Sequence, residues 1–116
     1  MNRIIDWYKI EKQNPKSYKE FSKWDAKKNE GFLEYINQRD LFEFFDERDL
    51  FIQINFSKGR FGYIIKSSFL DIDIINKFNY LHRVESEIIA FENCFNILEN
   101  LIDKKQNIIS LNGINK

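Results

Sequence analysis

The sequence predicts one α+β domain: N-terminal helices, then a central antiparallel β-hairpin or small three-stranded sheet, and finally a long C-terminal core helix. Three patterns support this fold class: helical spacing of apolar residues towards both ends, alternation of apolar and polar residues in the middle, and a glycine turn after the alternating segment. The length of 116 residues fits one domain, and a hydrophobic content of 43% supplies a core. We expect the domain to comprise residues 1–104 and residues 105–116 to form a flexible tail.

Two helices are predicted in the first quarter of the chain. Residues 3–12 place several apolar side chains on one helical face, and Asn14 and Pro15 end that helix. The same two residues suit the start of the second helix, because Asn is a favourable N-cap and Pro lacks only an N–H that the first turn leaves unpaired. Gly31 suits the left-handed residue that follows this helix, and residues 32–47 are predicted to form one or two more helices.

The middle of the chain is predicted to form an antiparallel hairpin. Residues 50–57 alternate apolar with polar side chains, which is typical of a half-buried strand. Residues 58–60, Lys-Gly-Arg, form the turn, and residues 61–68 return as the second strand. Residues 69–82 are compatible with a third strand or with an irregular crossing, and the sequence leaves this choice open.

The strongest helical pattern lies near the C-terminus, between residues 84 and 105. Acidic residues near its start and lysines at its end complement the helix macrodipole. The segment is therefore predicted to be the core helix and to end at Lys105. Its apolar residues recur at 3-4-3-4 spacing, at Ile88, Phe91, Phe95, Leu98 and Ile102.

The sequence predicts a cytoplasmic protein without a membrane segment. No uncharged apolar run approaches the roughly 18 residues of a membrane span. The first ten residues carry Arg3, Asp6 and Lys9 in place of an apolar signal region. Cys94 is the single cysteine, so no internal disulfide can form, which agrees with a reducing compartment.

Catalysis and metal binding are not expected. His82 is the single histidine and Cys94 the single thiol. Twelve helical residues would separate them by about 18 Å, which is too far for a nucleophile and its base. One His and one Cys do not supply the four ligands of a structural zinc, and the four scattered glycines form no phosphate-binding loop. We therefore expect no enzyme activity, no cofactor and no metal.

A row of lysines is the first candidate binding surface. Residues 9–28 hold seven lysines against three acidic residues, whereas residues 30–103 hold seven basic and fourteen acidic residues. On a helix, four of these lysines fall within about an 80° arc, opposite Tyr18, Phe21 and Trp24. This row, called the lysine stripe below, consists of Lys16, Lys19, Lys23 and Lys27.

The lysine stripe has two interpretations. Lysines on a surface helix are commonly only solvated, and the chain is rich in residues read from A/T-rich codons, lysine among them, which favours that view. Alternatively, ammonium groups spaced by about 5 to 6 Å follow a phosphate backbone or an acidic protein groove. Lysine makes point-charge contacts, so such a surface gives affinity without sequence readout.

Two further sets of residues are candidate contacts. An acidic set could hold a hard cation or meet a basic channel of a partner, but the preferred interpretation is the solvated face of a helix; it consists of Asp40, Glu43, Asp46, Glu47 and Asp49. Residues 59–66, GRFGYIIK, are similar to the basic and aromatic strand of RNA-recognition motifs, although the first two residues are swapped and the strand order differs. That resemblance implies contacts to single-stranded nucleic acid from Arg60, Phe61, Tyr63 and Lys66. The preferred interpretation is that Tyr63 and Ile65 face the core.

The overall plan resembles a group of phage proteins. Lysine-rich N-terminal helices, an Ile- and Phe-rich hairpin and residues 82–102, HRVESEIIAFENCFNILENLI, are similar to small accessory proteins of bacteriophages that infect AT-rich hosts. Some such proteins, the anti-CRISPR proteins among them, are stoichiometric inhibitors of host defence nucleases. An Arg-x-Glu-x-Glu start that leads into an Ala-Phe helix carries the resemblance, at Arg83, Glu85, Glu87, Ala90 and Phe91.

The resemblance implies binding rather than turnover. It predicts a small non-enzymatic inhibitor of a nucleic-acid-handling defence enzyme, in the cytoplasm of a bacterial host, with a CRISPR effector nuclease or its guide RNA as partner. Either the acidic set occupies a basic channel of the enzyme, or the lysine stripe engages the guide. Two alternatives stay open: a stand-alone RNA- or DNA-binding module, and an immunity protein that neutralises a toxin nuclease. The sequence sets neither the target nor the oligomeric state.

Overall fold

The computed structural model describes residues 5–29, 38–69 and 73–114, and for residues 29, 75–78 and 106–114 it describes the backbone only. Four helices and three strands make up this part of the chain, which is the α+β fold that the sequence predicts. Gly31 and residues 32–37, the first part of the helical segment predicted for residues 32–47, lie outside the described residues, whereas Gln38–Asp46 of that segment form a helix as predicted. The elements are α1 (Trp7–Gln13), α2 (Pro15–Asn29), α3 (Gln38–Asp46), β1 (Phe51–Ser57), β2 (Arg60–Lys66), β3 (Ile74–Tyr80) and α4 (Arg83–Ile114).

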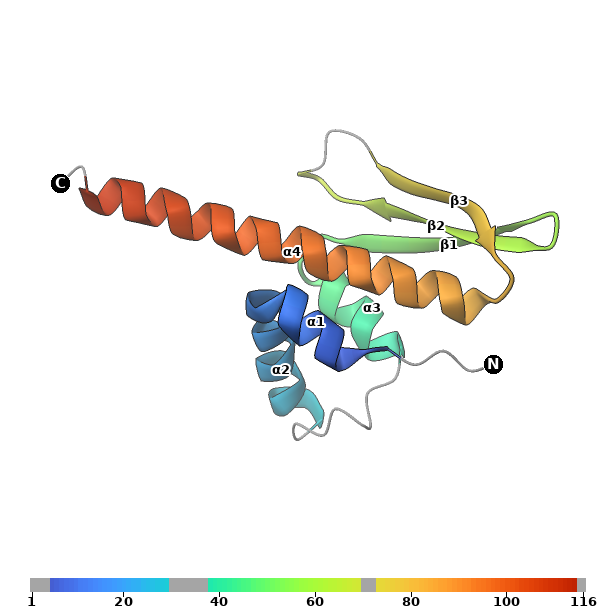
Figure 1. Cartoon of the computed structure of the whole chain (residues 1–116), viewed down its shortest axis with the longest axis horizontal. Coiled ribbons are helices and arrows are strands. Elements are labelled where there is room, and N and C mark those ends of the chain that lie inside the picture. Colours follow the sequence, from blue (N-terminus) through green and yellow to red (C-terminus); the bar gives the residue numbers. More distant parts are fainter. Residues whose placement is uncertain (1–4, 30–37, 70–72, 115–116) are drawn as a thin grey trace.

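Helix α4 lies between the sheet and the three N-terminal helices (Figure 1). Because α4 packs on both sides, its apolar surface is wider than the single stripe of a surface helix. Ala90, Phe91, Cys94 and Phe95 are all fully buried. On the helical side, the ring of Phe95 contacts rings from α1, α2 and α3. The C-terminal part of α4 extends past the rest of the molecule (Figure 1).

The sheet is antiparallel with strand order β1-β2-β3, so the hairpin strand β2 lies at its centre. Tyr63 and Ile65 of β2 are buried towards α4, which confirms their expected orientation. Residues 74–80 form a third strand, which settles the choice left open for residues 69–82. The strand pairs with β2 through a register shift between Phe61 and Tyr63.

The hairpin turn is tighter than the sequence predicts. Arg60 already belongs to β2 and pairs with Ser57, so the loop contains Lys58 and Gly59 alone. Both loop residues have positive φ, 52° for Lys58 and 78° for Gly59, as a type I′ turn requires. Gly adopts this conformation without strain, whereas Lys58 carries a side chain in the left-handed region.

We expect Lys58→Asn to raise the free energy of unfolding by about 0.5 to 1 kcal/mol, because Asn tolerates the left-handed conformation better than Lys. Urea denaturation followed by circular dichroism measures the change. Lys58→Ala is the matched control: it removes the same charge and keeps the backbone strain, so it should leave the stability nearly unchanged. Equal stabilisation by both substitutions would show that charge, and not the turn, is responsible.

Two helix ends differ from the prediction. Helix α1 begins at Trp7 rather than at residue 3, because the carboxylate of Asp6 accepts a hydrogen bond of 3.1 Å from the amide of Lys9 and caps the helix. Helix α4 runs to Ile114, nine residues past the predicted end at Lys105. No proline interrupts residues 105–114, and each residue added to an existing helix gains one backbone hydrogen bond without a new nucleation cost.

Helix α3 ends in a Schellman motif that leads directly into the sheet. The amide of Leu50 donates to the carbonyl of Phe45 at 2.9 Å, and the amide of Asp49 donates to the carbonyl of Asp46 at 3.1 Å. Asp49 has φ of 62°, the left-handed position of this motif. Its carboxylate also accepts a hydrogen bond of 3.2 Å from the amide of Ser68, which ties the helix end to the segment after β2.

No helix in the described ranges is long and apolar enough to cross a membrane.

Candidate functional site

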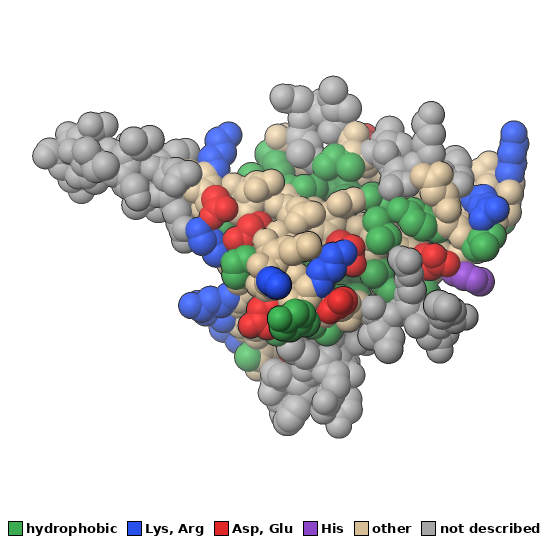
Figure 2. Space-filling model, viewed as in Figure 1, with side chains coloured by type: hydrophobic (Ala, Val, Ile, Leu, Met, Phe, Trp, Pro, Cys, Tyr) green, Lys and Arg blue, Asp and Glu red, His purple; other side chains and the backbone are tan. Residues whose placement is uncertain are grey.

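Helix α2 separates its rings from its lysines, as the sequence predicts. Phe21 is fully buried and stacks on the ring of Trp7 at a centroid distance of 5.3 Å. Tyr18 and Trp24 are half-buried and pack against the same core. All four members of the lysine stripe lie on the exposed side of the helix. Figure 2 shows basic side chains on the α2 side of the molecule, below the projecting part of α4.

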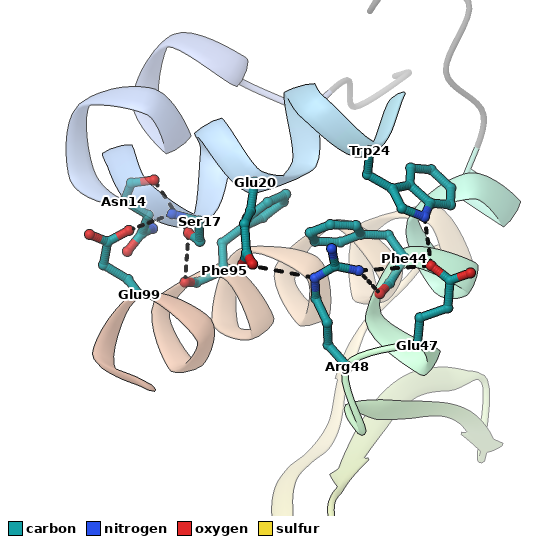
Figure 3. A network of polar contacts seen from close by, with 9 residues as sticks. All are labelled: Asn14, Ser17, Glu20, Trp24, Phe44, Glu47, Arg48, Phe95 and Glu99. Atoms are coloured by element: carbon teal, nitrogen blue, oxygen red, sulfur yellow. Dashed lines mark hydrogen bonds and ion pairs between the residues drawn. The ribbon is translucent and has the colours of Figure 1, made fainter. Parts of the chain in front are cut away.

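The start of α2 is held by α4. The amide of Ser17 donates to the carboxylate of Glu99 at 2.8 Å, and the Ser17 hydroxyl donates to the carbonyl of Phe95 at 3.0 Å (Figure 3). The carbonyl of Asn14 accepts the first helical hydrogen bond, from Tyr18, at 2.9 Å. A negative carboxylate at a helix N-terminus also matches the macrodipole. Glu99 is buried, so water does not readily compete for this contact. The contact therefore fixes the start of α2, where Lys16 begins the lysine stripe.

The middle of α2 is held by Arg48, just after α3 (Figure 3). The Arg48 guanidinium lies 3.8 Å above the ring of Phe44 and donates to the Phe44 carbonyl at 3.1 Å. It also lies 3.8 Å from the carboxylates of Glu20 and of Glu47. The indole N–H of Trp24 donates to the same Glu47 carboxylate at 2.6 Å. These contacts join the inner side of α2 to α3 and leave the outer side to solvent.

The ammonium groups of the lysine stripe differ in their partners. Lys16 forms an ion pair with Asp103 of α4. Lys19, Lys23 and Lys27 form no ion pair with any residue in the described part of the chain. Lys28 lies outside the stripe, pairs with Glu43, and places its ammonium 4.9 Å from the centre of the Trp24 ring. The positive charge of the stripe that has no ion-pair partner in the described residues therefore lies at Lys19, Lys23 and Lys27.

A shallow, open groove of about 300 Å³ lies between α2 and α4. Its polar side is formed by Lys16, Lys19, Lys23 and Glu20, and Ile102 contributes an apolar wall. Lys19 and Lys23 are one helical turn apart, which spaces their attachment points by about 6 Å. The groove can accept an anionic group that two ammonium ions contact at once.

Three members of the acidic set, Glu43, Asp46 and Glu47, are exposed, and the other two are buried or half-buried. Asp40 is nearly buried, Glu43 pairs with Lys28, and the carboxylate of Asp49 accepts hydrogen bonds from Ser68. Glu47 is the acceptor for Trp24. Asp46 stays exposed, and its pKa is raised by partial burial and by the nearby Glu43 carboxylate. Glu43, Glu47 and Asp49 therefore have partners within the fold, which the spacing of charges along the sequence does not reveal.

The four hairpin candidates are also divided by the fold. Tyr63 is buried, and its hydroxyl accepts a hydrogen bond from the Asn93 amide of α4, so its ring is not available to a base. Phe61 is half-buried and packs on Phe56. Arg60 and Lys66 are exposed and alternate with these aromatic residues along β2, so they point to the other side of the sheet. The predicted set is thus not one contact surface.

The two residues weighed for catalysis lie in different environments. Cys94 is fully buried in the core, and burial raises the pKa of its thiol, so the thiol stays protonated. His82 is exposed, and its carbonyl accepts the first hydrogen bond of α4, from the amide of Glu85 at 3.1 Å. Among the residues that the structure describes, no group of three His, Cys, Asp or Glu side chains is placed to hold a metal ion.

The fold and the site together define a small α+β domain with a positively charged helical surface beside a groove. No protein-family model matches the chain, and neither the curated proteins nor the solved structures contain a match. Sequence reasoning missed Glu99 and Asp103 as the residues that fix this surface. The available signal was their spacing: Glu99 lies four residues after the core residue Phe95, and Asp103 lies four residues after Glu99, so all three share one face of the helix.

Proposed function

We propose that the protein is a non-enzymatic inhibitor that docks on a nucleic-acid-handling defence enzyme, an RNA-guided nuclease, and contacts its guide RNA through the lysine stripe. One observation carries the proposal: Lys19, Lys23 and Lys27 project from one side of α2 with no ion-pair partner in the described part of the chain. Three ammonium groups along a rigid helix suit a run of phosphates.

The contacts of the other charged residues favour the lysine stripe over the acidic set as the docking surface. Glu43, Glu47 and Asp49 have partners within the protein, and breaking those contacts would cost stability. The lysines need no such rearrangement. The phage resemblance of the sequence supports an inhibitor rather than an enzyme, and the buried Cys94 thiol is not available as a nucleophile.

Charge reversal tests the RNA contact. Three lysine–phosphate contacts predict that affinity for a labelled 20-nucleotide single-stranded RNA falls by about 20-fold between 50 and 200 mM salt, because each contact releases counterions. We expect K19E/K23E/K27E to abolish this binding and its salt dependence in a fluorescence anisotropy titration.

A matched pair of variants shows whether position or only net charge matters. K19E/K23E and K104E/K105E change the net charge equally, and all four lysines are exposed. K19E/K23E should weaken RNA binding much more than K104E/K105E. Equal effects of the two variants would contradict a localised contact on α2.

A cleavage assay separates inhibition from simple binding. The wild-type protein should reduce target cleavage by an RNA-guided nuclease of the host in proportion to its concentration, and K19E/K23E/K27E should not. RNA binding without inhibition would instead support the alternative of a stand-alone RNA- or DNA-binding module. A protein that neither binds RNA nor inhibits the nuclease would contradict the proposal, and capture of a toxin nuclease would support an immunity protein.

A further inference from the structure

The hairpin carries positive charge and no negative charge. Between Asp49 and Asp71 the sequence contains no Asp or Glu, but it contains Lys58, Arg60 and Lys66. All three basic side chains are exposed, and none forms an ion pair with a described residue. Two of them, Lys58 and Arg60, lie at the hairpin turn. An anionic partner would meet no repulsion from carboxylates of the hairpin itself.

Two aromatic rings lie near the same turn, on the face of the sheet opposite to Arg60 and Lys66. Phe56 of β1 stands directly opposite Phe61 of β2, and their ring centroids are 4.8 Å apart at an interplanar angle of 49°. The pair lies on the same side of the sheet as Tyr63 and Ile65, which α4 buries, but nearer the turn. The side chain of Phe56 remains 62% exposed.

Phe56 is one of several exposed apolar residues at this end of the molecule. Leu81 and Val84, at the start of α4, are also exposed large hydrophobic residues. Figure 2 shows hydrophobic and basic side chains at the hairpin end of the molecule, with an acidic side chain between the hydrophobic ones and the histidine. Contiguous exposed apolar side chains mark interaction sites more often than isolated ones. The basic side chains at and beside the turn favour an anionic partner.

Single-stranded nucleic acid satisfies both requirements. Its bases are planar and stack on aromatic rings, and its phosphates lie within reach of basic side chains at the same turn. Duplex nucleic acid offers phosphates but keeps its bases paired and stacked, so it cannot use the rings. An acidic protein surface would use the charges and the apolar side chains, but it would not require that Phe56 and Phe61 be aromatic.

We propose that the hairpin turn is a second nucleic-acid contact, in which unpaired bases stack on Phe56 and Phe61 while phosphates of the same strand contact Lys58 in the turn and, as the strand passes round the turn, Arg60 on the opposite face. This replaces Tyr63 and Lys66 of the sequence-based set by Phe56 and Lys58. The inference rests on the proposed function, since both require an RNA ligand, and it adds that the RNA is single-stranded where it meets the hairpin.

The test compares two probes and three variants by fluorescence anisotropy at 50 mM salt. The probes are a 12-nucleotide oligo(U) and an abasic strand of equal length, which keeps the phosphates and lacks the bases. The variants are F56A/F61A, K19E/K23E and, as the matched control, F51A. Phe51 lies on the same strand as Phe56 but on the opposite face, and its side chain is 47% exposed.

We expect F56A/F61A to weaken oligo(U) binding at least about fivefold and to leave binding of the abasic strand unchanged, because base stacking on each ring is lost. F51A should bind both probes like the wild type. K19E/K23E should weaken both probes, since it removes phosphate contacts. F56W/F61W should retain oligo(U) binding, and the added indole fluorescence should be quenched when bases stack on it.

The outcomes separate this inference from the proposed function. Unchanged oligo(U) binding by F56A/F61A, with binding lost in K19E/K23E, would overturn the hairpin contact alone. Loss of oligo(U) binding in F56A/F61A but not in K19E/K23E would overturn the lysine stripe alone. A wild-type protein that binds neither probe would overturn both. If F56A/F61A kept full RNA affinity but lost nuclease inhibition, the hairpin would contact the nuclease protein, and the proposed nucleic-acid contact would be wrong.

Discussion

Phe95→Ala should lower the free energy of unfolding by about 3 to 5 kcal/mol. Phe95 is fully buried on α4, and its ring centroid lies 5.0 Å from that of Phe45, 5.9 Å from that of Phe21 and 6.1 Å from that of Trp7. One ring therefore joins α4 to the three N-terminal helices. Its removal leaves a cavity that no single helix can close, and a domain of this size has a total stability of only about 5 to 15 kcal/mol.

Urea denaturation followed by circular dichroism measures this loss. Phe95→Leu keeps most of the side-chain volume and should cost less than half as much. Phe56→Ala also removes a phenyl ring, but from an exposed position, and should change the free energy of unfolding by no more than about 0.5 kcal/mol. A loss below about 1 kcal/mol for Phe95→Ala would contradict the central place of this ring in the core.

Glu99→Ala should lower the free energy of unfolding by about 2 kcal/mol, because the buried amide of Ser17 then loses a charged acceptor at the start of α2. Glu99 accepts this hydrogen bond at 2.8 Å, and Ser17 is fully buried, so water does not readily replace the carboxylate. Glu99→Gln keeps an acceptor oxygen and should cost less, because only the interaction with the helix macrodipole is lost.

Asp103 provides the matched control, four residues further along the same helix. Its carboxylate pairs with Lys16, also in the first turn of α2, but both side chains are nearly half exposed. Asp103→Ala should therefore cost at most about 1 kcal/mol. The variant also leaves the Lys16 ammonium without this partner, so it should strengthen RNA binding slightly. Equal losses of stability for Glu99→Ala and Asp103→Ala would contradict a capping role for Glu99.

Local patterns in the sequence predicted most of the elements. The start of α2 at Pro15 follows from the chemistry of the Asn-Pro pair, and the opposite placement of rings and lysines on α2 follows from its helical period. The strands β1 and β2 follow from alternation, and the core position of α4 follows from the spacing of its apolar residues. Each of these signals depends on residues that are close together in the sequence, so the sequence alone is sufficient to predict these elements.

The third strand was not predictable in the same way. The segment of β3 places Ile74 and Ile75 side by side and Asn76 and Lys77 after them, so the sequence lacks the regular alternation that identifies a strand, and pairing with β2 determines its conformation. The extension of α4 to Ile114 was also missed, because its residues resemble a polar tail, and the helix that precedes them supplies the nucleus for their helical backbone. In both cases a neighbouring element determines the conformation.

The sequence alone determined that this chain has a basic helix, an aromatic core and a hairpin. Only the tertiary structure decided which charges remain available: Asp103 pairs with Lys16 across 87 positions, Glu99 reaches Ser17 across 82, and both contacts leave Lys19 and Lys23 beside an open groove. The physical reason is that helical and strand periods depend on neighbouring residues, whereas neutralisation of a charge and exposure of a ring depend on side chains that folding brings together from distant parts of the chain.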